Sequence, residues 1–158
     1  MGNADDHRRA LALLAEQTRL PVFAWGVAVH QAWRTALAGD LDAAEIHVEA
    51  ARDAGARSGQ ATVQSLYLSQ MICLRWQQGR LAEMLPELRL VSAPGVGLPA
   101  FEGLDALARW QDGDRRAAAD ALDRVTAAAF VDVPRGSLWS LAISAWAELA
   151  VALGDEHA

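Results

Sequence analysis

The sequence predicts an all-α protein of about eight helices, arranged as a right-handed superhelix of helical hairpins. Three observations predict this fold. Apolar residues recur at three- and four-residue steps along the chain, and the alternating patterns of strands are absent. A short peptide recurs at a spacing that suits stacked helix pairs. Glycine turns also separate the helical segments.

The repeated peptide is Arg-Trp-Gln-x-Gly, which occurs at residues 75–79 and again at 109–113. The second copy begins 34 residues after the first (75 to 109), and 34 residues is the period of a tetratricopeptide-type helix pair. A repeat at this period predicts stacked hairpins, which favour a binding or regulatory surface over a catalytic pocket.

Four expected turns share one design, in which glycine follows an apolar helix and a charged residue follows the glycine. Glycine supplies the left-handed residue that ends one helix, and an adjacent aspartate can cap the next helix. The turns are Gly39-Asp40, Gly79-Arg80, Gly113-Asp114 and Gly154-Asp155. Their unequal spacing predicts an irregular array.

The helical segments follow from these turns and from the apolar stripes between them. The stripe Leu41, Ala44, Val48 and Ala51 follows the first turn, and Ala118, Ala121, Leu122, Val125 and Ala129 repeat it after Gly113. The expected helices span residues 4–18, 21–38, 41–56, 60–78, 81–92, 98–112, 115–128 and 136–153.

Three prolines and two loops refine these boundaries. Pro21 suits the first position of a helix, and Pro86 is expected to kink the 81–92 helix or to move its start. Residues 92–99, with Pro94, and 130–134 are expected to be loops. The 63–76 segment is apolar almost all round, which predicts burial at the centre of the stack.

Composition excludes several classes of function. The 158 residues carry a net charge of −6, and all 14 basic residues are arginine, a bias typical of a bacterium with a GC-rich genome. An acidic chain without a basic stripe argues against binding to nucleic acid or to anionic membranes. The longest uncharged apolar run, 20–29, is too short to span a bilayer. A single cysteine, Cys73, and a charged N-terminal segment without a signal peptide predict a cytoplasmic protein.

Three stretches of the chain carry a family likeness. They are Thr18-Arg19-Leu20-Pro21 with Trp25, residues 77–85 (QQGRLAEML), and residues 133–139 (VPRGSLW) running on to Leu153-Gly154-Asp155. With them the chain resembles the tetratricopeptide-like C-terminal region of LuxR/MalT-type bacterial signalling ATPases and of their cyclase-associated relatives. The resemblance implies a regulatory arm that follows an ATPase module. The chain itself has no phosphate-binding loop, cyclase domain or DNA-reading helix pair, so those functions are not expected of it.

Gly154-Asp155 also predicts the start of a further helix. We therefore expect residues 1–158 to form one repeat domain that is a fragment of a longer chain. The alternative is that a second copy covers the last apolar face, which makes the protein a possible homo-oligomer.

The candidate binding residues are the paired Arg75 and Arg109, their neighbours Trp76 and Trp110, and Trp33. Two arginines one repeat apart are expected to lie about 10 Å apart and could clamp a carboxylate or phosphate. In the competing interpretation, each tryptophan fills a gap between repeats and each arginine pairs with a nearby acid.

No catalytic, metal-binding or cofactor-binding residue is predicted. The four histidines (7, 30, 47 and 157) do not cluster, and Cys73 lies in the most apolar segment, where a buried thiol is inert. The sequence therefore predicts a non-enzymatic module that binds a protein or peptide partner, or the ATPase module of its parent protein. The alternatives are a small-molecule-sensing repeat domain and a stand-alone adaptor.

Overall fold

A computed structural model describes residues 2–92, 98–133 and 135–155. Within those ranges the chain is helical and contains no strand, which confirms the all-α prediction. The helices are α1 Gly2–Thr18, α2 Pro21–Leu37, α3 Leu41–Ser58, α4 Val63–Gln77, α5 Leu85–Val91, α6 Glu102–Gln111, α7 Arg115–Ala127 and α8 Trp139–Asp155, with 3-10 turns η1 Leu81–Met84 and η2 Pro99–Phe101. The chain divides into two compact units, residues 1–78 and 79–158.

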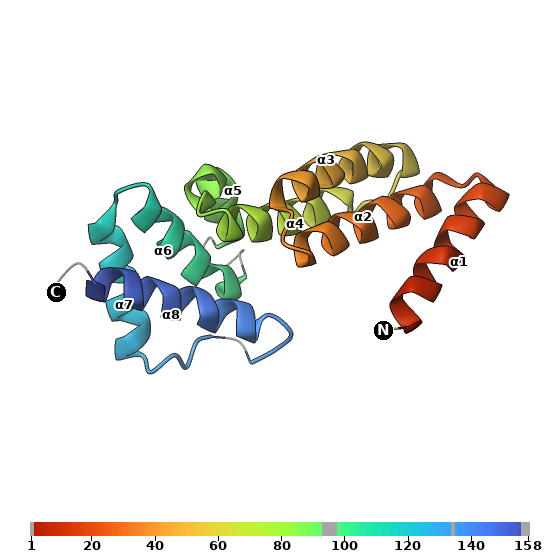
Figure 1. The fold of residues 1–158 in the computed structure, drawn as a ribbon. Helices are drawn as coiled ribbons and strands as arrows, with labels where there is room; N and C mark the ends of the chain where they lie inside the picture. The colour runs from red at the N-terminus through yellow and green to blue at the C-terminus, as the bar shows by residue number, and fades with distance from the viewer. Residues whose placement is uncertain (1, 93–97, 134, 156–158) are drawn as a thin grey trace. The chain divides into compact units, whose positions relative to one another are not determined.

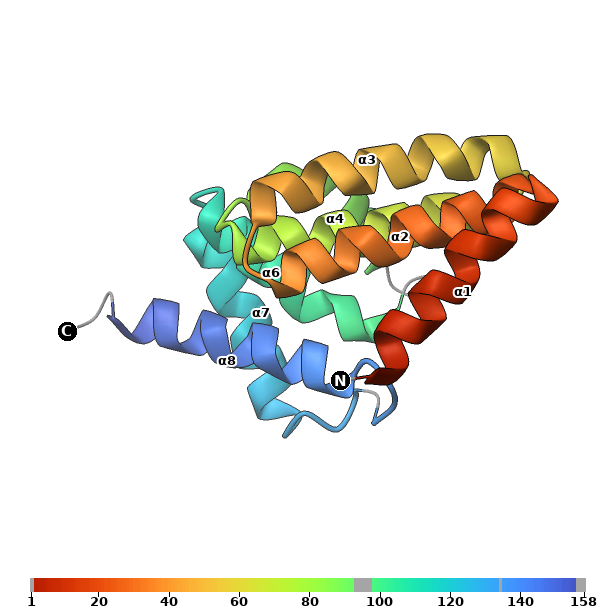
Figure 2. The same cartoon turned by 45° about the vertical axis from the view of Figure 1, so that its right-hand side comes forward.

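Unit 1 contains α1 to α4. Helices α2 and α3 run side by side as an antiparallel hairpin, and α4 packs on α3 (Figures 1 and 2). The predicted stripe forms the buried face of α3, because Ala44, Val48 and Ala51 are at most 2% exposed. Helix α1 contacts α2 and diverges from it away from their connection. Two leucines of α1, Leu13 and Leu14, remain exposed.

Gly55 allows the end of α3 to approach two other segments of unit 1 closely. A Cβ atom at this position would lie 2.6 Å from Val63 Cγ1 and 3.0 Å from Trp25 Nε1. Any larger residue would therefore have to push apart the helices that carry these side chains. Helix α3 continues past the expected end at residue 56 and stops at Gly59, which has a φ of 69°.

The glycine turns at 39, 79 and 113 adopt the predicted left-handed conformation, with φ values of 85°, 69° and 92°. The expected turn at Gly154 was wrong, since α8 runs through Gly154 to Asp155. Glycine permits the left-handed conformation but does not impose it, so a Gly-Asp pair alone does not end a helix.

Aspartate capping is confirmed at the starts of α3 and α7. Asp40 accepts a hydrogen bond from the backbone N–H of Ala43 at 3.1 Å, and Asp114 accepts one from Ala117 at 3.1 Å. Each cap satisfies a backbone donor that the first helical turn leaves without a partner.

We expect Asp40→Ala and Asp114→Ala each to lower the free energy of unfolding by about 1 kcal/mol, the usual contribution of such a cap. Chemical denaturation of the two variants measures this loss. Asp53→Ala, on the exposed face of α3, is the control and should change stability by less than about 0.5 kcal/mol. Equal effects of all three substitutions would contradict the capping role.

Unit 2 is organised around α6, which contacts η1, η2, α5, α7 and α8. The side of α6 that faces these neighbours is buried at Gly103, Leu104, Ala106, Leu107 and Ala108. The predicted 81–92 helix is divided, because Pro86 lies in the first turn of α5 and the preceding residues form η1. The 98–112 segment likewise starts with η2 at Pro99.

Two other boundaries differ from the sequence prediction. The 60–78 helix begins at Val63, and within it burial is confined to the second half, from Gln70 to Arg75, so the 63–76 segment is not buried along its whole length. Helix α8 begins at Trp139 rather than at residue 136. Within the described ranges, no helix is both long and apolar enough to cross a bilayer.

Candidate functional site: a charged pocket in unit 2

Arg75, in the last turn of α4, is held inside unit 1. Its two terminal nitrogens each donate to a different oxygen of Glu45 on α3, at 2.5 Å, and Nη1 also donates to Gln78 Oε1 at 2.6 Å. The residue is only 7% exposed. This two-point pairing matches the planar guanidinium to the carboxylate and ties α4 to α3.

Arg109 occupies the equivalent position in the last turn of α6 in unit 2, but it has a different partner. Its Nε donates to Asp105 Oδ2 at 2.6 Å, one turn earlier in the same helix. That hydrogen bond raises the pKa of the Arg109 guanidinium. The residue 34 positions before Asp105 is Met71, so the first copy of the repeat has no acid at the matching position and Arg75 pairs with α3 instead.

The three candidate tryptophans, Trp33, Trp76 and Trp110, are half-buried. Trp76 and Trp110 have polar or ring interactions within the structure. Gln111, which follows Trp110, accepts a hydrogen bond from the backbone N–H of Ala82 at 3.2 Å and so fixes η1 to the end of α6. The repeated peptide therefore has structural contacts in both units.

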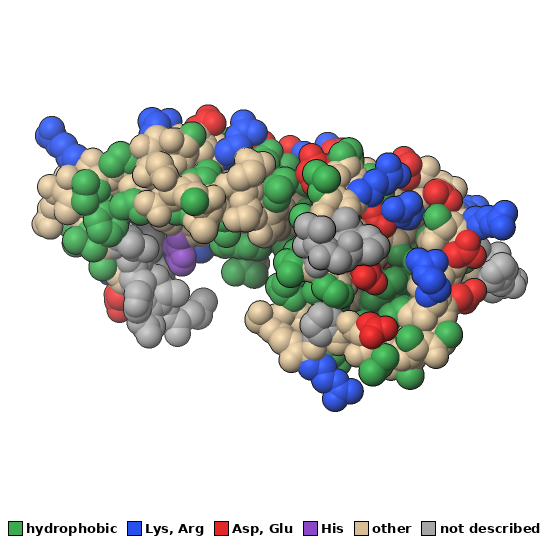
Figure 3. Space-filling view, turned by 180° about the vertical axis from the view of Figure 1, so that it is seen from behind, with side chains coloured by type: hydrophobic (Ala, Val, Ile, Leu, Met, Phe, Trp, Pro, Cys, Tyr) green, Lys and Arg blue, Asp and Glu red, His purple; other side chains and the backbone are tan. Residues whose placement is uncertain are grey.

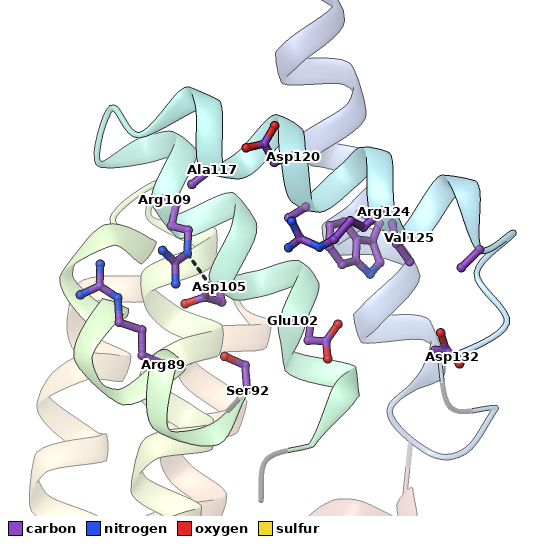
Figure 4. A pocket seen from close by; sticks show the side chains of 13 residues that line it. Arg89, Ser92, Glu102, Asp105, Arg109, Ala117, Asp120, Arg124, Val125 and Asp132 are labelled. Atoms are coloured by element: carbon purple, nitrogen blue, oxygen red, sulfur yellow. Dashed lines mark hydrogen bonds and ion pairs between the residues drawn. The ribbon is translucent and has the colours of Figure 1, made fainter. Parts of the chain in front are cut away.

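Of the five candidate binding residues, Arg109 alone lines a pocket within unit 2 that has a volume of about 760 Å³ (Figure 4). Its walls come from α5, α6, α7, α8 and the segment after α7. The lining residues are Arg89, Ser92, Glu102, Asp105, Arg109, Ala117, Asp120, Ala121, Arg124, Val125, Ala128, Asp132 and Trp146.

Helical spacing explains how two elements supply most of this lining. Glu102, Asp105 and Arg109 follow at three- and four-residue steps and form one stripe of α6. On α7, Ala117 and Ala121 line the pocket with Arg124 and Val125, and Ala128 follows directly after the helix. The small side chains of α7 leave room in front of the charged stripe of α6.

The lining carries three guanidinium groups and four carboxylates. Figure 4 shows Asp105 and Arg109 of α6 joined by a hydrogen bond, with Glu102 on the same helix and Asp132, from the segment after α7, to its right. Burial raises the pKa of the Glu102 carboxyl; Arg124 lowers it, and Asp132 and Asp105 raise it further. The space-filling view shows acidic and arginine side chains interspersed with apolar ones over unit 2 (Figure 3).

Two polar atoms of the lining are buried without a hydrogen-bond partner among the described residues: Asp105 Oδ1 and Trp146 Nε1. Trp146 is 3% exposed. Its indole lies against Gly103 of α6, where an added Cβ would be 3.1 Å from Nε1. An unpaired buried donor or acceptor costs free energy, so both atoms are destabilising as they stand.

Most residues of this site are not among the candidates that the sequence predicts. Its only sequence signal is the spacing of Glu102, Asp105 and Arg109, which resembles an ordinary exposed helix face. Among the residues the structure describes, no group of three or more metal-binding side chains is found. Burial raises the pKa of the Cys73 thiol, which disfavours the reactive thiolate.

The chain was compared with protein-family models, with curated proteins and with solved structures. None of the three comparisons found a match.

Proposed function

We propose that this chain is a non-catalytic protein-interaction and regulatory module of a bacterial multidomain signalling or transcription-regulating ATPase. In this proposal it binds a polar segment of a partner protein, or of its parent's ATPase module, in the pocket of unit 2. The observation that carries the proposal is the pocket itself, whose lining combines arginine and carboxylate side chains. An extended peptide supplies both kinds of hydrogen-bonding group from its main chain.

The link to a signalling ATPase rests on the sequence resemblance. It predicts that the reading frame encoding this chain also encodes a Gly-x-x-x-x-Gly-Lys-[Ser/Thr] loop upstream, because the resemblance places the regulatory arm after the ATPase module. A reading frame without that loop would leave a stand-alone adaptor.

The proposal assigns binding to Arg109 together with Arg89 and Arg124. Arg109 is the candidate from the repeated peptide that lines the pocket, whereas Arg75 is committed to Glu45. Among the described residues, neither Arg89 nor Arg124 has an acidic partner within ion-pair distance. Their guanidinium groups are therefore available to acidic or carbonyl groups of a bound segment.

Selection from a phage-displayed library of random peptides tests the proposal. Peptides enriched on the wild-type chain should bind Ala121→Trp at least tenfold more weakly, because the indole would fill the space in front of α6. Ala50→Trp, on an exposed position of α3, is the matched control and should bind as the wild type does. Enrichment of no peptide, or equal binding to all three proteins, would count against a peptide-binding pocket.

A small-molecule sensor is the second candidate, and the pocket volume favours it. About 760 Å³ lies within the range of small-ligand sites. A thermal-shift screen against polar metabolites separates the two candidates. A metabolite that stabilises the wild type and Ala50→Trp, but not Ala121→Trp, would assign the pocket to a small ligand.

A further inference from the structure

We infer that the pocket of unit 2 recognises a neutral carboxamide, the side chain of a glutamine or asparagine in the bound segment, between Glu102 on α6 and Arg124 on α7. This inference rests on the proposed function and names the class of side chain that its pocket selects. It commits to a neutral group that both donates and accepts hydrogen bonds, as opposed to an acidic, basic or apolar one.

The first step concerns the positions of these two side chains. Both line the pocket, and Figure 4 shows Arg124 above Glu102. Among the residues that the structure describes, neither side chain has an ion-pair partner. Burial raises the pKa of the Glu102 carboxyl and the positive charge of Arg124 lowers it, so the two groups interact without direct contact. A third group can therefore bridge them.

The second step is the charge balance of the lining. Apart from the hydrogen-bonded pair of Asp105 and Arg109, the lining carries two guanidinium groups and three carboxylates. A bound cation would be repelled by both guanidinium groups, and a bound anion by all three carboxylates. A neutral dipole avoids both repulsions, because its negative end can turn toward a guanidinium group and its positive end toward a carboxylate. The five charged groups are Arg89, Arg124, Glu102, Asp120 and Asp132.

The third step is the hydrogen bonding that the pair requires. A carboxamide has an acceptor oxygen and two N–H donors, so it can accept from the Arg124 guanidinium while it donates to the Glu102 carboxylate. Each of these bonds has a charged partner, which makes it stronger than a bond between two neutral groups. A neutral amide also loses less solvation free energy than an ion when it leaves water. Ala117 and Ala121 leave space beside the pair for the methylene groups of the ligand.

Nuclear magnetic resonance of the wild-type chain tests this inference. The backbone N–H signals of α6 and α7, identified by sequential assignment, are followed during titration with capped tripeptides Gly-Xaa-Gly in which Xaa is glutamine, glutamate, lysine or norleucine. The four peptides share one main chain, so differences between them report the side chain alone. We expect the glutamine peptide to shift these signals saturably and to bind about fivefold more tightly than the other three, the effect of one net hydrogen bond. Equal affinities, tighter binding of a charged peptide, or no shift with any peptide would overturn the inference.

Two charge-removing variants give a sharper test, because they should reverse the preference. In Glu102→Gln the Arg124 charge is no longer balanced by Glu102, so this variant should bind the glutamate peptide more tightly than the glutamine peptide. In Arg124→Gln the Glu102 charge remains, so the lysine peptide should bind most tightly. Asp53→Asn and Arg57→Gln, at exposed positions of α3, remove the same charges outside the pocket and should keep the preference for glutamine. An unchanged preference in both pocket variants would overturn the assignment to this pair.

The peptide selection separates this inference from the proposed function. Selected peptides that require an open pocket, but whose affinity survives replacement of every glutamine and asparagine by norleucine, would support the proposed function and overturn the inference. Failure of the selection to yield any pocket-dependent peptide, with no shift in the titration, would overturn both.

Discussion

Arg75→Ala is expected to lower the free energy of unfolding by about 3 kcal/mol, which would make Arg75 a structural residue. Arg75 is 7% exposed, and its guanidinium donates to both oxygens of Glu45 and to Gln78. Its removal would leave the Glu45 carboxylate, itself 30% exposed, without its main partner between α3 and α4. Breaking one side of such a buried pair typically costs about 3–5 kcal/mol, and the partial exposure of Glu45 places this pair at the lower end.

Urea denaturation followed by circular dichroism measures the loss. Arg80→Ala is the matched control, because the Arg80–Glu83 pair is almost half exposed and should contribute less than about 1 kcal/mol. Glu45→Gln combined with Arg75→Ala should cost less than the sum of the two single changes, since both remove the same interaction. A loss below about 1 kcal/mol in Arg75→Ala, with reduced peptide binding, would instead favour the clamp that the repeated peptide predicts.

The architecture of each hairpin could be predicted because its determinants are local. Gly39 and Gly113 end their helices, and Asp40 and Asp114 cap the next ones, through contacts that span only a few residues. The buried stripe of α3 depends only on helical periodicity. Spacing and residue type are both readable from the chain, so these features followed from the sequence.

The roles of Arg75 and Arg109 could not be predicted in the same way. The two residues occupy the same position of a repeated peptide, yet one pairs with Glu45, 30 residues earlier, and the other with Asp105, four residues earlier. The choice depends on which acid the surrounding helices bring within reach. The pocket has the same origin, because it needs α5, α6, α7 and α8 together and no single segment contains its pattern.

The helix boundaries show how local signals compete. Pro86 was expected either to kink its helix or to move the start of that helix. The structure shows that the start has moved, because η1 precedes α5. Gly154 carries the same Gly-Asp signal as Gly39 and remains helical. Glycine allows both conformations at similar free energy, so the Gly-Asp signal alone does not decide between them.

A large stability effect in unit 2 is expected from Leu88→Ala, at about 3 kcal/mol. Leu88 is fully buried, at 0% exposure, in α5, a helix that contacts α6. Truncation to alanine removes the transfer free energy of the lost methyl and methylene groups and leaves a cavity, which together cost about 2–5 kcal/mol. Because α5 also carries Arg89, this packing holds one wall of the pocket in place.

Leu90→Ala is the matched control, since Leu90 lies two residues away in the same helix and is 75% exposed. The same leucine-to-alanine substitution at this exposed position should change the free energy of unfolding by less than about 0.5 kcal/mol. Denaturation of the two variants measures the difference between their free energies of unfolding. Titration of each folded variant without urea, with a peptide selected on the wild-type chain, shows whether binding in the pocket depends on the packing of α5. Equal stabilities of Leu88→Ala and Leu90→Ala would mean that α5 is not anchored by Leu88, and the position of Arg89 in the pocket wall would then lose its structural basis.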